Sequence, residues 1–186
     1  MTVDLDRQEG AEGEARRLAA IVRHSNELIN LADLDGRMVF LNDAGARMLG
    51  IDPERVDQFN IRQVIPPHFQ ELLERELLPK ILAGECWEGE LQYRNLRTGA
   101  LIDVYAVVFS IAEPKVGGRA YLASISRDIT RRKQAELESK ETFQRLHDII
   151  EFLPDPTFVI DQHHVVVVWN KAMEQITTVP AHEMIG

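Results

Sequence analysis

Residues 38–44 read Met-Val-Phe-Leu-Asn-Asp-Ala, and a similar stretch, Val-Val-Val-Trp-Asn-Lys-Ala, occupies residues 166–172. The two stretches lie 128 positions apart (170 − 42, the numbers of their asparagines). The similarity extends without a gap over Arg17–Gln58 and Arg145–Gly186. A repeat of this length is a small domain with a linker, because solenoid units recur at roughly 20–50 residues. The sequence therefore predicts one complete domain followed by the opening part of a second copy.

The composition limits the kind of partner that the chain can bind. Its net charge of −9 argues against a nucleic-acid surface, which needs clustered Lys and Arg. The single cysteine, Cys86, excludes an intrachain disulfide and suits a reducing cytosol. No stretch reaches the roughly 18 apolar residues of a membrane span, so we expect a cytoplasmic protein with no membrane segment in this chain. Residues 1–14 are acidic and poor in large apolar side chains, which predicts a disordered tail.

Hydrophobic periodicity and turn signals predict the order of the elements. Asn42 suits an N-cap, Gly50 suits a left-handed helix end, and the Asp35-Gly36 pair suits a hairpin turn. A further turn is expected at Pro114–Gly118. We expect helices at residues 15–27, 43–49, 69–82 and 130–152, and strands at 28–33, 37–41, 87–96, 101–112 and 119–129.

These strands are grouped rather than alternating with helices, which is typical of an α+β fold. We expect a five-stranded antiparallel sheet with helices on one face, flanked by N-terminal and C-terminal linker helices. The strand around residues 104–111 is apolar at nearly every position, so both of its faces should be covered. The helices cover one face, and the N-terminal helix or a second subunit would cover the other.

Several short motifs resemble the PAS domain family with its C-terminal PAC portion. Phe40-Leu41-Asn42-Asp43-Ala44 and its copy Trp169-Asn170-Lys171-Ala172 are similar to the family's aromatic-x-Asn-x-Ala signature. Trp87-Glu88-Gly89-Glu90 resembles the opening of the third strand, and Arg97-Thr98-Gly99 resembles the turn after it. Arg127-Asp128-Ile129-Thr130 resembles the Asp-Ile-Thr motif that ends the fifth strand. The resemblance implies a sensor, in which an event in a pocket between sheet and helices moves the exit helix and a downstream effector.

With this resemblance the chain divides into four predicted segments. They are an acidic tail at 1–14, a PAS domain with its PAC portion at 15–131, a linker helix with a possible coiled coil at 132–152, and the N-terminal part of a second PAS domain at 153–186.

The family's facing implies which side chains line the pocket. The candidates are Phe40, Phe59, Ile61, Leu91, Tyr93, Leu122, Ser124 and Ser126. One interpretation is a small polar ligand held by Ser124, Ser126 and Tyr93. The alternative is that these hydroxyls bond to backbone or water, as most buried hydroxyls do. Because many of the candidates are large, a scaffold whose pocket is filled by its own side chains stays open as a third interpretation.

Cofactor chemistry is disfavoured at the positions where the family places it. Light-sensing flavin members carry a reactive Cys where this chain has Ile61, and a Gln where it has Ser126. Haem-binding members ligate iron through a His on the long helix, and His68 stands at the start of that helix. A His at a helix start is more often a surface or capping residue, so ligation by His68 is the weaker interpretation. No Cys/His spacing resembles a metal site.

The end of the domain carries the expected output. The resemblance assigns signal relay to Asp128 and Thr130, where the fifth strand passes into the exit helix. Further along, Phe143, Leu146, Ile150 and Leu153 step by three, four and three residues, which is a coiled-coil seam. This seam predicts a homodimer; the alternative is a helix that packs on its own domain.

Together these features predict a non-catalytic sensory and dimerisation module of bacterial-type signal transduction, such as a two-component phosphorelay. A second possibility is that the chain is the regulatory front of a sensor histidine kinase or cyclic-dinucleotide enzyme. A third is a scaffold PAS domain with no ligand. None of the motifs specifies the signal or the output domain.

Overall fold

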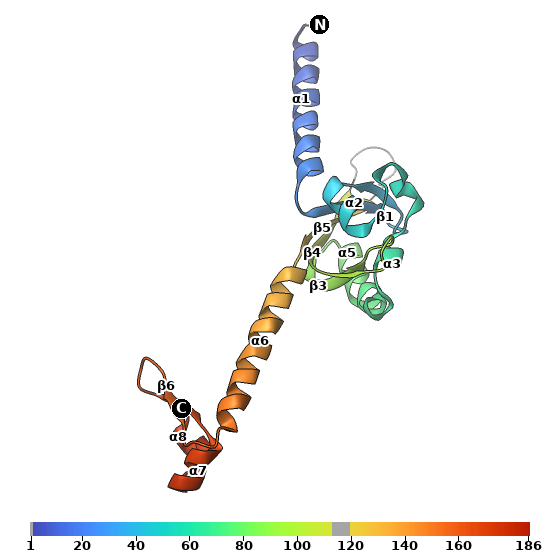
Figure 1. The fold of residues 1–186 in the computed structure, drawn as a ribbon. Helices are drawn as coiled ribbons and strands as arrows, with labels where there is room; N and C mark the ends of the chain where they lie inside the picture. The colour runs from blue at the N-terminus through green and yellow to red at the C-terminus, as the bar shows by residue number, and fades with distance from the viewer. Residues whose placement is uncertain (1, 113–119) are drawn as a thin grey trace. The chain divides into compact units, whose positions relative to one another are not determined.

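The computed structural model describes residues 2–112 and 120–186, so the turn expected at Pro114–Gly118 lies outside the described residues. The chain divides into two compact units, Met1–Arg131 and Arg132–Gly186. Figure 1 shows the elements in chain order. Within the described ranges, no helix is both long and apolar enough to cross a membrane.

A five-stranded antiparallel sheet forms the centre of the first unit, with the strand order β2-β1-β5-β4-β3. The first and last strands of this sheet in chain order are therefore neighbours, since β1 pairs with β5 from Leu28↔Ser126 to Asp33↔Tyr121. The strands are β1 (Leu28–Asp33), β2 (Met38–Leu41), β3 (Trp87–Arg94), β4 (Leu101–Ala112) and β5 (Ala120–Asp128). This sheet, with helices between β2 and β3, confirms the predicted α+β fold.

The turn between β1 and β2 forms for the reason that its sequence predicts. Gly36 has a φ of 84°, a conformation that side chains with a Cβ disfavour. The Asp33 carboxylate accepts hydrogen bonds from the backbone N–H groups of Asp35 (3.1 Å) and Arg37 (2.8 Å). This local bonding fixes the register that brings β2 back along β1.

Short helices connect β2 to β3. The Asn42 side chain caps α2 (Asp43–Leu49) by accepting from the Gly45 N–H at 2.9 Å, and Gly50 ends the helix with a φ of 69°. Asn60 caps α3 (Ile61–Val64) within a reciprocal capping box. A 3₁₀ turn, η1 (Pro53–Gln58), lies between them.

The sequence predicts one regular helix at residues 69–82, but the structure has four short helical pieces there. The segment consists of a 3₁₀ turn η2 (Pro67–Phe69), α4 (Gln70–Leu72), a π-helical turn η3 (Leu73–Leu77) and α5 (Leu78–Leu82). Pro79 gives a physical reason, because it lacks a backbone N–H and its ring clashes with the carbonyl four residues earlier. That carbonyl belongs to Arg75, inside the π-helical turn.

The N-terminal helix is longer than the sequence predicts. The structure has α1 running from Thr2 to His24, whereas the sequence predicts a disordered tail at residues 1–14. The low hydrophobicity of residues 1–14 argues against a buried helix face. It is compatible with a solvated helix, because Ala, Glu, Arg and Gln are good helix formers. On the part of α1 with described side chains, Leu18 and Ile21 are 56% and 69% exposed.

The core lies between the helices and one face of the sheet. On β4, Val104 and Ala106 are fully buried, whereas the alternate residues Tyr105 and Ile111 are 38% and 42% exposed. The expectation that both faces of this strand are covered is therefore wrong for the single chain. The sequence of β4 correctly indicates an apolar outer face, but α1 does not cover that face.

The second unit repeats the opening of the first. It contains the helix α6 (Thr130–Glu151, which begins two residues before the division between units), the strands β6 (Phe158–Ile160) and β7 (Val166–Trp169), and the helices α7 (Lys171–Thr177) and α8 (Ala181–Met184). Asn170 caps α7 by accepting from the Met173 N–H at 3.0 Å, as Asn42 caps α2.

Candidate ligand pocket

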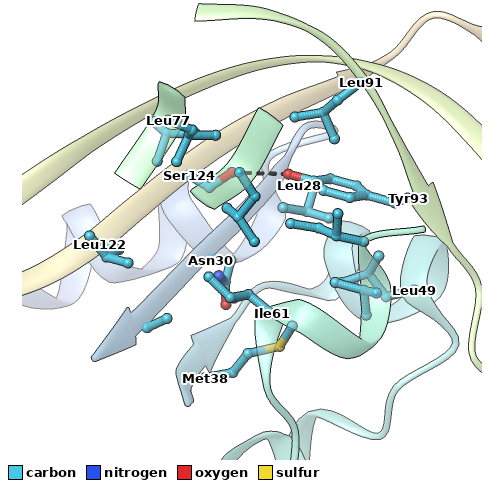
Figure 2. A pocket seen from close by; sticks show the side chains of 15 residues that line it. Leu28, Asn30, Met38, Leu49, Ile61, Leu77, Leu91, Tyr93, Leu122 and Ser124 are labelled. Carbon is cyan, nitrogen blue, oxygen red and sulfur yellow. Dashed lines mark hydrogen bonds between the residues drawn. The ribbon is translucent and has the colours of Figure 1, made fainter. Parts of the chain in front are cut away.

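A cavity of about 50 Å³ lies between the inner face of the sheet and the helices of the first unit. Figure 2 shows its walls, with Leu122 and Ser124 from β5 and Leu91 and Tyr93 from β3. The lining residues are mostly aliphatic: Leu28, Asn30, Ala32, Met38, Leu49, Ile61, Val64, Ile65, Leu73, Leu77, Leu91, Tyr93, Val108, Leu122 and Ser124.

The π-helical turn forms part of the wall. Its first and last residues, Leu73 and Leu77, are both buried and both line the cavity. The turn is held to β3 by the Trp87 indole N–H, which donates to Glu76 Oε1 at 3.1 Å. This bond, followed by that from Lys80, lowers the pKa of Glu76 below its ordinary value. π-Helical turns occur frequently at functional sites, and this one shapes the pocket.

Three hydroxyl groups on β3 and β5 form a closed cluster beside the cavity. The Tyr93 hydroxyl lies 3.3 Å from Ser124 Oγ and 3.0 Å from Ser126 Oγ, and the two serine oxygens are 3.1 Å apart. Figure 2 shows the Tyr93–Ser124 bond. Each hydroxyl has one proton to donate, so three groups in a ring satisfy one another's donors. Burial raises the pKa of Tyr93, against the opposing effect of the two serine bonds.

Asn30 is the polar residue that the sequence reasoning missed. It is 5% exposed, it lines the cavity, and its side-chain oxygen has no hydrogen-bond partner among the described residues. A signal for it exists in the sequence: Asn30 alternates with Leu28 and Ala32, so strand geometry places all three on one face. A polar residue on a core-facing position of an apolar strand points to a site.

The structure brings together five of the eight predicted pocket residues. Ile61, Leu91, Tyr93, Leu122 and Ser124 line the cavity. Ser126 is fully buried and belongs to the hydroxyl cluster, but it does not line the cavity. Phe59 packs against the core from a partly buried position, and Phe40 is half-buried; neither lines the cavity.

His68 lies away from the pocket. Its imidazole is exposed, packs against Phe69 and has its Nε2 3.1 Å from Gln92 Oε1. It is not among the residues that line the cavity. Among the residues with described positions, no group of three or more His, Cys, Asp or Glu side chains is arranged to hold a metal ion.

The predicted relay residues join the end of β5 to β4. Thr130 Oγ1 accepts from the Asp103 N–H at 3.1 Å, and the Ile129 N–H donates to the Asp103 carbonyl at 2.9 Å. The Asp128 carboxylate accepts from the Thr130 N–H at 2.8 Å, which caps the start of α6. The first turn of the exit helix is therefore tied to a strand that also lines the pocket through Val108.

The entry and exit of the first unit meet at Glu27. Its carboxylate pairs with Arg127 at 2.6 Å, and its carbonyl accepts from the Asn42 side chain at 2.8 Å. The same Asn42 nitrogen lies 3.1 Å from the carbonyl of Val22, near the end of α1. The Asn42 side-chain oxygen accepts from the Ile29 N–H of β1 at 3.0 Å and from the Gly45 N–H of α2, so one buried amide joins the incoming helix, β1 and α2.

The seam residues of α6 lie on its exposed surface. Phe143 and Leu146 are 72% and 55% exposed, and Ile150 is half-buried. The helix ends at Glu151, so Leu153, the last residue of the predicted seam, lies beyond it. The chain turns at that point, where the Leu153 N–H donates to the Ile150 carbonyl at 3.2 Å.

Comparison with known proteins gives one consistent family. A family model described as "PAS domain" matches residues 26–131, more than half of the chain, and one described as "PAS fold" matches residues 144–186. A comparison with curated proteins gives no match.

Solved structures share the fold at low identity. A PAS domain of an HTR-like protein from Haloarcula marismortui is 23% identical, with a TM-score of 0.55, over 67% of this chain and 98% of that one. A PAS domain from Colwellia psychrerythraea is 19% identical, with a TM-score of 0.56, over 63% and 98%. A PAS domain from a two-component sensor histidine kinase is 15% identical, with a TM-score of 0.53, over 63% and 98%.

Proposed function

The chain belongs to the PAS domain family, and we propose that it is a sensory input module that relays an event in its pocket through α6 to a downstream effector. In this proposal the chain catalyses no reaction itself. Its signal is the occupancy of the cavity between sheet and helices.

The observation that carries the proposal is the position of β5. This strand contributes Leu122 and Ser124 to the cavity wall, and it ends at Asp128, directly before α6. Thr130 and Ile129 then bond to Asp103 on β4. A shift of the wall therefore has a short covalent and hydrogen-bonded route to the first turn of α6. Packed cores change between discrete arrangements rather than deforming continuously, so a small shift is able to bias that turn.

A pocket-filling substitution tests this relay without knowledge of the ligand. Ala32 is fully buried and lines the cavity, so Ala32→Leu places three additional carbon atoms there. We expect the amide hydrogen exchange of residues 128–134 to change by about twofold or more, the scale of a modest population shift. Ala83→Leu, at an exposed position, is the matched control and should leave those rates unchanged. Identical rates at 128–134 in Ala32→Leu and the native chain would refute the relay.

We also propose that the functional state is a homodimer. The exposed apolar residues on the outer face of β4, on α1 and on α6 support this, because water-exposed apolar groups of this size are stabilised by burial. Two copies of α6 joined along Phe143, Leu146 and Ile150 would transmit a rotation of the first turn as a change in helix register. Light scattering that gives the monomer mass at high protein concentration would contradict this part of the proposal.

The host of such a module is proposed to be a histidine kinase or a cyclic-dinucleotide enzyme, with this chain as its cytoplasmic regulatory front. Support comes from two domains of similar fold, one from a two-component sensor histidine kinase and one from a sensory box sensor histidine kinase/response regulator of Geobacter sulfurreducens. A scaffold PAS domain without a ligand is the second candidate. The small volume of the cavity, about 50 Å³, favours that candidate over a bound flavin or haem.

A further inference from the structure

The pocket contains one buried polar atom that the described residues leave unsatisfied. Asn30 is 5% exposed, and its side-chain oxygen accepts no hydrogen bond from any described residue. An acceptor that is buried in this way needs a partner from outside these residues, either water or a ligand atom, because an unmade bond destabilises the folded chain. Nearly all buried polar groups in folded proteins have a partner. Asn30 is therefore the place where a ligand atom would contribute most.

The rest of the pocket explains why Asn30 differs from the other polar residues there. Tyr93 and Ser124 also line the cavity, but their hydroxyls bond to each other and to Ser126. Three hydroxyls in a ring can each donate to a neighbour, so none of them needs a ligand to be satisfied. Figure 2 shows Asn30 in the pocket wall apart from the Tyr93–Ser124 bond. The hydroxyl cluster is therefore satisfied within the protein, whereas the side-chain oxygen of Asn30 has no partner among the described residues.

The lining also fixes the charge of an occupant. Among the fifteen residues that line the cavity, none is Lys, Arg, His, Asp or Glu. A carboxylate or ammonium group placed there would lose its hydration and find no charged partner, which is strongly unfavourable. Amino acids and carboxylates are therefore poor occupants, and a neutral molecule is favoured.

The size and polarity of the cavity narrow the choice further. A volume of about 50 Å³ accommodates roughly three to five atoms of water size, at about 10–15 Å³ for each. A buried water needs two to four polar partners, and most of the wall offers only aliphatic carbon. Water can serve Asn30 but cannot fill the remaining volume favourably. A molecule with an apolar body and a single hydrogen-bond donor suits both the Asn30 oxygen and the aliphatic wall.

We propose that the pocket binds a neutral, mostly apolar molecule of roughly three to five non-hydrogen atoms that donates one hydrogen bond to Asn30 Oδ1. This is the chemistry of a short-chain alcohol. The inference rests on the proposed function, because it names the ligand class for the same pocket. It assigns to Asn30 the role of specificity-determining residue.

The test compares two isomers that differ in the donor. 1-Butanol and methyl propyl ether contain the same atoms, but only the alcohol has an O–H group. Binding is measured on the full chain by the NMR shifts of the Ile61, Leu91 and Leu122 methyl groups, which line the cavity. We expect the native chain to bind the alcohol about tenfold more tightly than the ether, which corresponds to one net hydrogen bond.

Asn30→Leu supplies the variant, because leucine has a similar volume and no polar atom. The preference for the alcohol should fall to about twofold or less, while both isomers still bind, since the variant removes only the acceptor. Asn26→Leu, at an exposed position, is the matched control and should keep the native preference. Asn30→Leu should melt no lower than the native chain, because an unsatisfied polar group has been replaced by an apolar one.

The outcomes separate this inference from the proposed relay. If the two isomers bind the native pocket equally, or if Asn30→Leu keeps the preference, the assignment of Asn30 is overturned and the relay is untouched. If neither isomer shifts the pocket methyl groups, the ligand class is wrong. The relay is judged separately by the Ala32→Leu exchange experiment, which requires no ligand. If Asn30→Leu does not fold, Asn30 is structural and the inference fails.

Discussion

Asn42 and its copy Asn170 show how one residue organises each unit. In both, the side-chain oxygen caps the following helix and also accepts from the first strand or the residue before it, at Ile29 N–H and Thr157 N–H. Both asparagines are almost fully buried. The side-chain nitrogen is directed at backbone carbonyls of the preceding segment: Val22 and Glu27 in the first unit, and Ile150, Leu153 and Asp155 in the second. Their recurrence in the sequence therefore reflects a joint between an incoming helix and a domain.

Replacing Asn42 should be more destabilising than replacing a more accessible cap. Asn42→Ala removes a cap and leaves buried backbone groups without partners, which should lower the free energy of unfolding of the first unit by about 3 kcal/mol. Asn60→Ala, where water can replace the lost bonds, should cost about 1 kcal/mol. Urea denaturation followed by Trp87 fluorescence in a Trp169→Phe background measures both. Equal costs for the two variants would show that the buried joint is not a stabilising unit.

Tyr93 should give the pocket a characteristic response to alkaline pH. Burial raises its pKa above the ordinary value of 10.0, so the folded state holds the phenolic proton more tightly than the unfolded state. The resulting stability is fully present below pH 10 and is lost as the pH rises through the folded pKa. Tyr93→Phe lacks this dependence, although it is less stable at neutral pH by about 1 kcal/mol through its lost hydrogen bonds. Tyr105 is present in both proteins, so its titration cancels when the stability of the variant is subtracted from that of the native chain. The remaining pH dependence belongs to Tyr93.

Denaturation at a series of pH values on either side of the ordinary tyrosine pKa of 10.0 checks this prediction. The stability difference between the native chain and Tyr93→Phe should narrow above that pH. A difference that stays constant, or widens, would mean that Tyr93 is not protonated more tightly in the folded state.

At the scale of elements, the exit helix and the π-helical turn differ in how far the rest of the protein buries them. The exit helix α6, which the structure describes along its whole length, has no buried residue, so its own domain does not account for its apolar stripe. The π-helical turn, by contrast, is fixed by packing: Leu73 and Leu77 are buried, and Glu76 bonds to Trp87. The π-helical turn shapes the pocket, and the exposed apolar stripe of α6 supports the dimer proposed above.

Placing charged residues in the apolar seam of α6 tests whether two copies of the helix associate there. Phe143→Asp and Leu146→Asp together should dissociate a dimer, because two carboxylates would be buried against their counterparts. Leu137→Asp is the matched control: Leu137 is 61% exposed and, at about 100° per residue, lies about 120° around the helix from Phe143. Light scattering should give half the mass for the double variant and the native mass for the control. An unchanged mass for the double variant would refute the seam.

At the scale of the whole molecule, local signals predict the sheet and its turns well. The strand ranges, the Asn42 cap and the Gly36 turn each depend on a few neighbouring residues, and the structure has them. The features that sequence reasoning misses depend on distant contacts. Segments far apart in sequence decide these features by how they pack together. Examples are the missing hydrogen bond at Asn30 among the described residues, the π-helical turn at Leu73–Leu77 and the exposure of Tyr105.

The pocket illustrates the same limit. Facing along β3 and β5 predicts Leu91, Tyr93, Leu122 and Ser124 on the inner face, and all four line one cavity. The volume left between them is not predictable from the sequence, because it is the small difference between a large space and the side chains that fill it. For the same reason Phe40 and Phe59 are predicted in the pocket but do not line it: Phe59 packs against the core, and Phe40 is half-buried.

The most direct single measurement combines the pocket-filling variant with a break in the relay. Thr130→Val keeps the shape of the side chain and removes the hydroxyl that bonds to Asp103. Hydrogen exchange of residues 131–140 is recorded for the native chain, Ala32→Leu, Thr130→Val and the double variant, which forms a double-mutant cycle. We predict that Ala32→Leu changes these rates in the native background and changes them less in the Thr130→Val background, because the Ile129 N–H bond to Asp103 remains. An equal change in both backgrounds, or no change in either, would contradict a relay from the pocket to α6 through Thr130.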